Sequence, residues 1–98
     1  MKDMVHNQNQ VEKQTAADVW SRCMQIVKEE VNNETYASLF EPIVPLVLRD
    51  NTLTIQVPSH GVYEYIEENY GDLLRRVIRK ELGPSGKLTY SIISVRKP

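Results

Sequence analysis

Residues 52–63 read TLTIQVPSHGVY. From Thr52 to Val57 apolar side chains alternate with polar ones, which is the period of a strand with one buried face. Pro58 has no N–H group to donate to a neighbouring strand, so the strand ends before it. Ser59 then supplies a side-chain oxygen that can cap the first free N–H groups of a helix. The stretch therefore predicts a strand that passes directly into a helix, because the apolar residues beyond it recur every three or four positions: Val62, Ile66, Tyr70, Leu73 and Val77.

Length, charge and cysteine content limit the function of the chain. Its 98 residues are enough for one small domain with a modest hydrophobic core. A formal net charge of −1 argues against binding a polyanion through bulk charge. Cys23 is the only cysteine, which excludes an intrachain disulfide and a cysteine metal cluster. No apolar run approaches the ~20 residues that cross a bilayer and no apolar secretory segment begins the chain, so we expect a cytoplasmic protein without membrane attachment.

The sequence divides into three parts. Residues 1–14 are polar and lack periodicity, so we expect a disordered arm. Residues 15–96 carry the periodic segments and form the predicted domain. Residues 97–98 are expected to be a cut end or the start of a linker.

Three helices are predicted in this domain. Residues 15–18 read TAAD, the pattern of a capping box, and open the first helix. Two asparagines at 32–33 stop this helix and can cap a short second one over residues 34–40. A long third helix is predicted over residues 59–82, with acidic residues first and basic residues last, as the helix dipole favours. Gly71 weakens the middle of this helix by about 1 kcal/mol relative to Ala, and we expect a kink there.

Three strands complete the predicted fold. Pro45 interrupts the apolar run 43–48, which places this strand at a sheet edge or beside a bulge. A tight turn at 49–52, which contains Asp and Asn, predicts antiparallel pairing with the second strand. The last strand, residues 88–95, follows a helix and is therefore expected to lie parallel to its neighbour. The element order is helix, helix, strand, strand, helix, strand, so we predict an α+β fold with helices packed on a small three-stranded sheet.

The sequence contains no recognisable catalytic set. His60 lies at a helix start, and no Ser, Cys or Asp stands at a motif spacing from it, so we interpret it as a surface residue. Cys23 lies on the apolar face of the first helix and is interpreted as a small buried hydrophobe. We therefore predict no enzyme activity, no cofactor and no metal site in this chain.

Two features keep a nucleic-acid function open. Residues 83–86 read GPSG, which spells the GxxG loop of KH domains. That loop joins two helices, whereas this one is predicted to join a helix to a strand, so we interpret it as a helix stop. A local basic set leaves weak single-stranded nucleic-acid binding by a KH-like module as the alternative function: Arg75, Arg76, Arg79 and Lys80.

Trp20 is the candidate for a binding anchor. It lies in the first turn of the first helix, where a Trp either caps the core or stays partly exposed. Trp is seldom fully buried and is enriched at protein interfaces. Its position alone therefore leaves both a core and an interface role open.

Five pieces of sequence occur in a characteristic order and spacing: VWSRC at 19–23, YASLFEPI at 36–43, DNTL at 50–53, VPS at 57–59 and YIEENY at 65–70. This series resembles the N-terminal domain of the bacterial chromosomal replication initiator DnaA, and its Bacteroidetes branch in particular. The resemblance covers about residues 16–95.

The resemblance implies a KH-like fold with the same element order and a non-enzymatic role. In this family the domain is an assembly platform that self-associates as a weak dimer or oligomer, helps to load the replicative helicase at the origin and docks regulators of initiation. The ATPase domain and the DNA-reading helices lie further along the full protein. This chain contains no GxxxxGK[ST] phosphate loop, so ATP binding is expected only of the parent protein.

The resemblance also implies two binding surfaces. The self-association surface falls on the first helix, at Val19, Trp20 and Cys23. The helicase and regulator surface falls on the starts of the second and third helices, at Glu34, Thr35, Ser59, His60, Gly61 and Tyr63. Two positions depart from the family pattern: many relatives carry an acid in place of Thr35 and an aromatic in place of Gly61. Glu34 is the candidate to replace the acid, and His60 or Tyr63 the aromatic anchor.

Overall fold

The structure is a computed structural model that describes residues 14–93. The predicted arm over residues 1–14 lies outside this part of the chain except for Gln14, and so does everything predicted for residues 94–98. Helices and strands follow one another in the predicted order, namely α2 (Ala16–Glu30), α3 (Asn33–Thr35), η1 (Tyr36–Phe40), β1 (Val44–Arg49), β2 (Thr52–Val57), α4 (His60–Leu82) and β3 (Lys87–Ile92). The α+β fold class is therefore confirmed.

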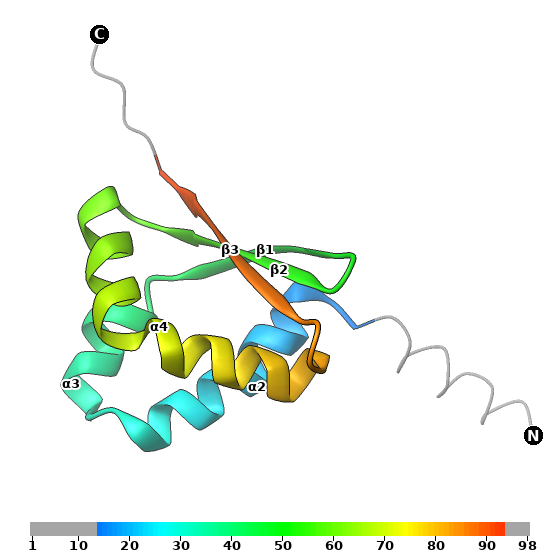
Figure 1. The fold of residues 1–98 in the computed structure, drawn as a ribbon. Helices are drawn as coiled ribbons and strands as arrows, with labels where there is room; N and C mark the ends of the chain where they lie inside the picture. Colours follow the sequence, from blue (N-terminus) through cyan, green and yellow to red (C-terminus); the bar gives the residue numbers. More distant parts are fainter. Residues whose placement is uncertain (1–13, 94–98) are drawn as a thin grey trace, which may run out of the picture.

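The sheet has three strands, and the helices pack on one of its faces. Its strand order is β1-β2-β3, with β1 antiparallel and β3 parallel to β2, as predicted. Figure 1 shows the strands together on one side of the molecule and all the helices on the other. On β2, Leu53, Ile55 and Val57 are fully buried against the helices. Each such side chain contributes about 1.5–3 kcal/mol when it is removed from water, which is why the alternation in β2 fixes the orientation of the sheet.

The turn between β1 and β2 requires left-handed backbone at two positions. Asp50 has φ 53° and Asn51 has φ 62°, the combination of a two-residue hairpin turn that matches the twist of the strands. The Asn51 amide also donates to the Leu82 carbonyl at 3.1 Å and to Ser85 Oγ at 3.0 Å. The turn predicted from sequence is confirmed, and it additionally ties the hairpin to the end of α4.

Strand β1 is both an edge strand and a bulged one. It pairs only with β2 among the described strands, and the register shifts between Pro45 and Val47. A proline is tolerated at such a place because no ladder hydrogen bond is needed from its nitrogen. Both interpretations of Pro45 are therefore confirmed.

Side-chain caps begin the helices where the sequence predicts. Thr15 Oγ1 accepts from the Asp18 N–H at 3.1 Å, and the Thr15 N–H donates to Asp18 Oδ2 at 3.3 Å, which completes the capping box. Ser59 Oγ accepts from the Val62 N–H at 3.2 Å and caps α4. Asn32 Oδ1 accepts from the Thr35 N–H at 2.7 Å and caps the second helical segment.

The second helix differs from the prediction in its winding. Its first turn is α-helical, and residues 36–40 then form a π-helical turn, closed by the bond from the Glu41 N–H to the Tyr36 carbonyl at 3.0 Å. Such wider turns occur as short insertions and frequently lie at functional sites. The apolar spacing of Tyr36, Leu39 and Phe40 indicated a helix but not this local widening.

Helix α4 changes direction near its middle. The helix is continuous from His60 to Leu82, and Figure 1 shows its first turns running at an angle to the rest. Arg75 Nη1 donates to Glu67 Oε1 at 3.1 Å across this region, and the Tyr90 hydroxyl of β3 donates to Glu67 Oε2 at 2.7 Å. Gly71 is buried beneath the ion pair: a Cβ at this position would lie 2.9 Å from Arg75 Nη2 and 3.2 Å from Glu67 Oε1. Glycine therefore lets the ion pair pass close to the helix backbone.

The effect of Gly71→Ala on stability should depend on Arg75. In an Arg75→Ala chain the added methyl group should raise the free energy of unfolding by about 1 kcal/mol, the usual gain of Ala over Gly inside a helix. In the parent chain the same methyl group displaces the guanidinium from Glu67, so the gain should be smaller or absent. Urea unfolding of the four chains measures the difference, and equal gains in both backgrounds would contradict this role of Gly71.

Candidate interaction surfaces

A pocket joins the start of the second helical segment to the start of α4. It encloses about 380 Å³ and is lined by Thr35, Ser38, Leu39, Gly61, Val62 and Tyr65. We call it the helix-start pocket. Thr35 and Gly61 come from the two segments that the resemblance pointed to. The structure brings them together although they are 26 positions apart in the sequence.

The connection between β2 and α4 creates one wall of this pocket. Pro58 ends the strand and Ser59 caps the helix, so His60 and Gly61 form the first turn of α4. A Cβ on Gly61 would meet only Ser59 Oγ, at 3.9 Å, so this wall stays open. Ser59 is exposed, and its Oγ caps the helix by accepting from the Val62 N–H.

The other predicted residues of this surface have different places. Glu34 and His60 are exposed and neighbour the pocket in sequence, and His60 Nε2 lies 3.1 Å from Glu64 Oε2. Tyr63 is half-buried and packs edge to face on Tyr90 of β3, with ring centroids 4.9 Å apart. Tyr63 lines a separate pocket with Glu67 and Arg75, so the structure does not join it to Thr35 and Gly61.

Sequence reasoning missed the apolar side chains of the pocket. Tyr65 is 51% exposed and is one of the few large hydrophobic side chains on the described surface. Its signal in the sequence was its spacing, since Tyr65 follows Gly61 by one helical turn and lies on the same face. Leu39 and Val62 are half-buried and were attributed to the apolar faces of their helices, which is also where they pack.

The three residues predicted for self-association lie in the hydrophobic core. Val19 and Cys23 are fully buried, and Trp20 is 5% exposed. The structure therefore supports the core role of Trp20 that its sequence position left open. Self-association through the first helix stays a prediction. Because these three side chains are buried, it would act mainly through other groups that the core holds in place.

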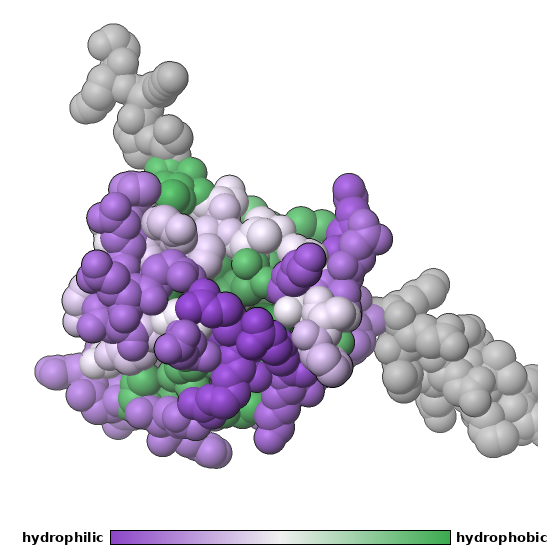
Figure 2. Space-filling view, in the orientation of Figure 1, coloured by the Kyte–Doolittle hydropathy of each residue, from purple (hydrophilic) through white to green (hydrophobic). Residues whose placement is uncertain are grey.

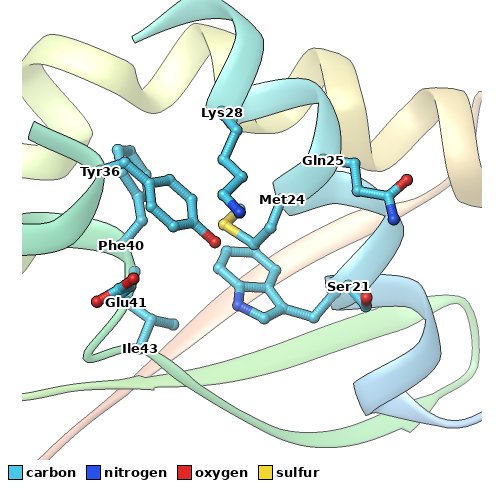
Figure 3. A pocket seen from close by; sticks show the side chains of 9 residues that line it. Ser21, Met24, Gln25, Lys28, Tyr36, Phe40, Glu41 and Ile43 are labelled. Atoms are coloured by element: carbon cyan, nitrogen blue, oxygen red, sulfur yellow. The ribbon is translucent and has the colours of Figure 1, made fainter. Parts of the chain in front are cut away.

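Trp20 also reaches a second pocket between α2 and η1. This pocket encloses about 350 Å³, and its lining combines apolar and polar side chains: Trp20, Ser21, Met24, Gln25, Lys28, Tyr36, Phe40, Glu41 and Ile43. Figure 3 shows Met24, Lys28 and Tyr36 pointing toward one another across it. The Lys28 ammonium lies 5.2 Å from the centroid of the Tyr36 ring, a cation–π contact, and burial raises the pKa of the Tyr36 hydroxyl.

Burial also controls the chemistry of Cys23. Its Sγ lies 3.8 Å from the Val77 carbonyl of α4, and desolvation, with a smaller contribution from the Glu81 carboxylate, raises the pKa of the thiol to about 12. The interpretation of Cys23 as a small buried hydrophobe is confirmed.

Charges are unevenly placed along the surface. The two segments that form the helix-start pocket, residues 33–41 and 60–72, contain acidic residues and no Lys or Arg. The basic residues of α4 follow residue 72 in the sequence. Figure 2 shows a largely hydrophilic face over α4. Two of its arginines are paired: Arg75 with Glu67 and Asp72, and Arg76 with Glu30 of α2 at 3.3 Å. Paired guanidinium groups are poorly placed to collect phosphates.

The GPSG segment ends α4, as interpreted from the sequence. Gly83 adopts φ 96° directly after Leu82, and β3 begins at Lys87. The segment therefore joins a helix to a strand and does not have the helix–loop–helix setting of a KH clamp.

Residues 14–93 form neither a metal site nor a membrane-spanning helix. Within this range no three His, Cys, Asp or Glu side chains come together in a way that could hold a metal ion. No helix in the described part of the chain is long and apolar enough to cross a membrane.

The fold and its surface define a small α+β domain whose open features are pockets beside its helices. The chain belongs to the DnaA N-terminal domain family, whose family model matches residues 17–80. This confirms the resemblance noted in the sequence.

Relatives come from the same group of bacteria that the sequence suggested, and from outside it. The chain is 43% identical over 75 residues to the chromosomal replication initiator protein DnaA of Bacteroides fragilis, which covers 76% of the chain and 16% of the relative. It is 45% identical over 78 residues to the DnaA of Flavobacterium psychrophilum and 42% identical over 78 residues to that of Chlorobaculum tepidum, in both cases over 80% of the chain and 16% of the relative. The match thus spans about 16% of the length of these relatives.

The Cys23 thiol should be almost unreactive in the folded chain. A pKa raised from 9.0 to about 12 lowers the thiolate fraction at pH 8 about a thousandfold, and only the thiolate attacks disulfide reagents. Labelling with a coloured disulfide reagent should therefore be slow in buffer and fast in urea. Fast labelling of the folded chain at pH 8 would contradict the burial of Cys23.

Stability should also fall at high pH through this group. Because the pKa of the thiol is higher in the folded chain than its ordinary value of 9.0, its contribution to stability is fully present below pH 9 and is lost as the pH rises toward 12. The loss between pH 9 and pH 10 should be smaller in Cys23→Ala, which lacks the thiol. Urea unfolding of both chains at pH 8, 9 and 10 measures this, and equal losses would contradict it.

Proposed function

We propose that this chain is the protein-protein interaction domain of a chromosomal replication initiator and works without catalysis of its own. Membership of the DnaA N-terminal domain family supports this, together with the names of the relatives. ATP binding and the recognition of origin DNA are assigned to the remainder of a longer cytoplasmic parent protein, since the matched region is about 16% of each relative.

The helix-start pocket is the proposed docking site for the replicative helicase and for regulators of initiation. One observation carries this assignment: two segments that are distant in sequence, and that the family resemblance marks independently, meet in one open pocket. Tyr65 supplies exposed aromatic area at its rim, and such side chains dominate binding energy at interfaces. The neighbouring carboxylates, Glu34 and Glu64, favour a partner that places basic residues around an apolar side chain.

Self-association is the second part of the proposed function. Val19 and Cys23 would support it by packing α2 against the rest of the core, and Trp20 would contribute through the pocket that it lines. A weak association suits a domain that has to assemble and disassemble at an origin.

The alternative function is binding of single-stranded nucleic acid. Because Arg75 and Arg76 are paired, Arg79 and Lys80 are left as the candidate phosphate contacts. No observation favours nucleic-acid binding over protein binding.

Tyr65→Ala should weaken binding of the replicative helicase from the same organism at least about tenfold, as expected for an exposed aromatic anchor. Gly61→Leu should weaken it as well, because the new side chain would fill the pocket while its Cβ meets only Ser59 Oγ. Biolayer interferometry with immobilised helicase and the 98-residue chain measures both affinities.

Ile93→Ala provides the matched control. Ile93 is 46% exposed, close to the 51% of Tyr65, but it directly follows β3 and lines none of the helix-start pocket. Unfolding in urea checks that each variant keeps its fold. Unchanged affinity in folded Tyr65→Ala and Gly61→Leu would reject this pocket as the helicase site, and no binding by the parent chain would reject helicase recruitment by this domain.

A further inference from the structure

Strand β3 leaves one edge of the sheet open. Its inner edge pairs in parallel with β2 from Lys87 to Ile92 without a shift of register, and no described strand lies beyond its outer edge (Figure 1). β1, at the opposite end of the sheet, differs because Pro45 has no N–H group and the register shifts beside it. A regular edge strand without proline presents a row of backbone groups with which another extended chain can pair. β3 is therefore the edge of this sheet that can accept a further strand.

The hydrogen bonds to β2 show which backbone groups of β3 are free. The Lys87 N–H donates to the Asn51 carbonyl at 3.0 Å, and the Ile93 N–H donates to the Val57 carbonyl at 3.1 Å. In a parallel pair, every second residue of a strand directs both of its backbone groups to the same neighbour. The odd-numbered residues from 87 to 93 therefore bond to β2. The residues between them direct their N–H and C=O groups to the outer edge: Leu88, Tyr90 and Ile92.

A pocket lies along this edge, between β3 and α4. It encloses about 520 Å³ and is lined by Tyr63, Glu67, Arg75, Leu88, Thr89, Tyr90 and Ile92. We call it the β3-edge pocket. The β3 residues with outward backbone groups stand opposite Leu53, Ile55 and Val57, so their side chains lie on the face of the sheet that the helices cover. A strand added here would place every second side chain on this face, at the pocket.

The lining of the β3-edge pocket determines which side chains can enter it. The rings of Tyr63 and Tyr90 pack edge to face there, with centroids 4.9 Å apart. The charged groups of the pocket neutralise each other, because Arg75 Nη1 lies 3.1 Å from Glu67 Oε1. An uncharged apolar side chain therefore suits the pocket. A phosphate would meet the Glu67 carboxylate and a guanidinium that is already paired.

We propose that the outer edge of β3 binds an extended segment of a partner protein as an added strand, with apolar side chains at every second position of that segment in the β3-edge pocket. Main-chain hydrogen bonds to Leu88, Tyr90 and Ile92 supply the affinity, and the pocket selects the side chains, as in other cases of strand addition. This surface goes beyond the proposed function, and it shares no lining residue with the helix-start pocket.

Amide hydrogen exchange followed by NMR locates the free groups. In the 98-residue chain the N–H groups of Leu88, Tyr90 and Ile92 should exchange at least about tenfold faster than those of Thr89 and Ser91, because only the latter donate to β2. Equally slow exchange at the outward groups would mean that the edge is already covered, and it would overturn the proposal.

The probe for binding is a capped peptide in which valine and phenylalanine alternate with threonine, with a lysine at each end for solubility. It should bind with a Kd below about 1 mM and slow the exchange of the outward N–H groups. Two N-methylated forms are the matched controls, since they keep all side chains and block the N–H groups of one or the other alternate set. One form should bind at least about tenfold more weakly, and the other should stay within about twofold of the parent peptide.

Ile92→Pro and Ile92→Ala form a matched pair on the protein side. Both remove most of the Ile92 side chain, but only proline also removes the outward N–H group. The bonds to β2 are kept in both, because this N–H group does not take part in them. Ile92→Pro should bind the peptide at least about fivefold more weakly than Ile92→Ala. Titration by NMR measures both affinities, and urea unfolding checks that both chains are folded.

The outcomes decide for or against strand addition. Absence of peptide binding up to about 1 mM, or equal losses in the two methylated forms, overturns it. Protection of the outward N–H groups by a thymidine oligonucleotide and not by the peptide assigns the edge to nucleic acid and also overturns it. Equal peptide affinities of folded Ile92→Pro and Ile92→Ala do the same. Tyr65→Ala should bind the peptide like the parent chain, so this surface and the helix-start pocket are tested separately.

Discussion

The connection at Pro58–Ser59 is the constraint on which the arrangement of this domain depends. β2 is the central strand, with β1 and β3 on either side, and its inward side chains are fully buried. Two residues then convert that strand into α4, because Pro58 cannot continue the ladder and Ser59 caps the helix. A connection this short leaves little freedom in the direction of α4. It therefore fixes Gly61 and Val62 beside Thr35, and with them the helix-start pocket.

Local chemistry explains why so much of the fold could be predicted from the sequence. The caps at Thr15, Asn32 and Ser59 and the left-handed turn at Asp50–Asn51 each depend on a few neighbouring residues, so their patterns indicate the structure directly. The candidate site is less local. Helical spacing placed Tyr63 and Tyr65 on α4, but the direction of each depends on what packs against it, and only Tyr65 faces the second helical segment.

Trp20 shows the same limit on the first helix. Its neighbours widen the apolar face to such a degree that spacing alone cannot tell a buried side from an exposed one. Packing decides it. Trp20 lies beside η1 and Ile43. Along the contact of α2 with α4, Arg22 binds Glu81 at 2.7 Å and Arg76 binds Glu30 at 3.3 Å. Val19 and Cys23 are consequently in the core, and any surface for self-association has to be sought among residues that this packing leaves exposed.

The helix-start pocket and the pocket between α2 and η1 share no lining residue, although both take side chains from the second helical segment. Tyr36 and Leu39 connect them most closely, since the first lines one pocket, the second lines the other, and both belong to η1. Two sites without shared residues compete only if a partner is large enough to cover both, and otherwise influence one another only through the packing between them. Under the proposed function, self-association through the pocket that Trp20 lines would leave the helix-start pocket open to another partner. Such separation would let one small domain assemble and recruit at the same time.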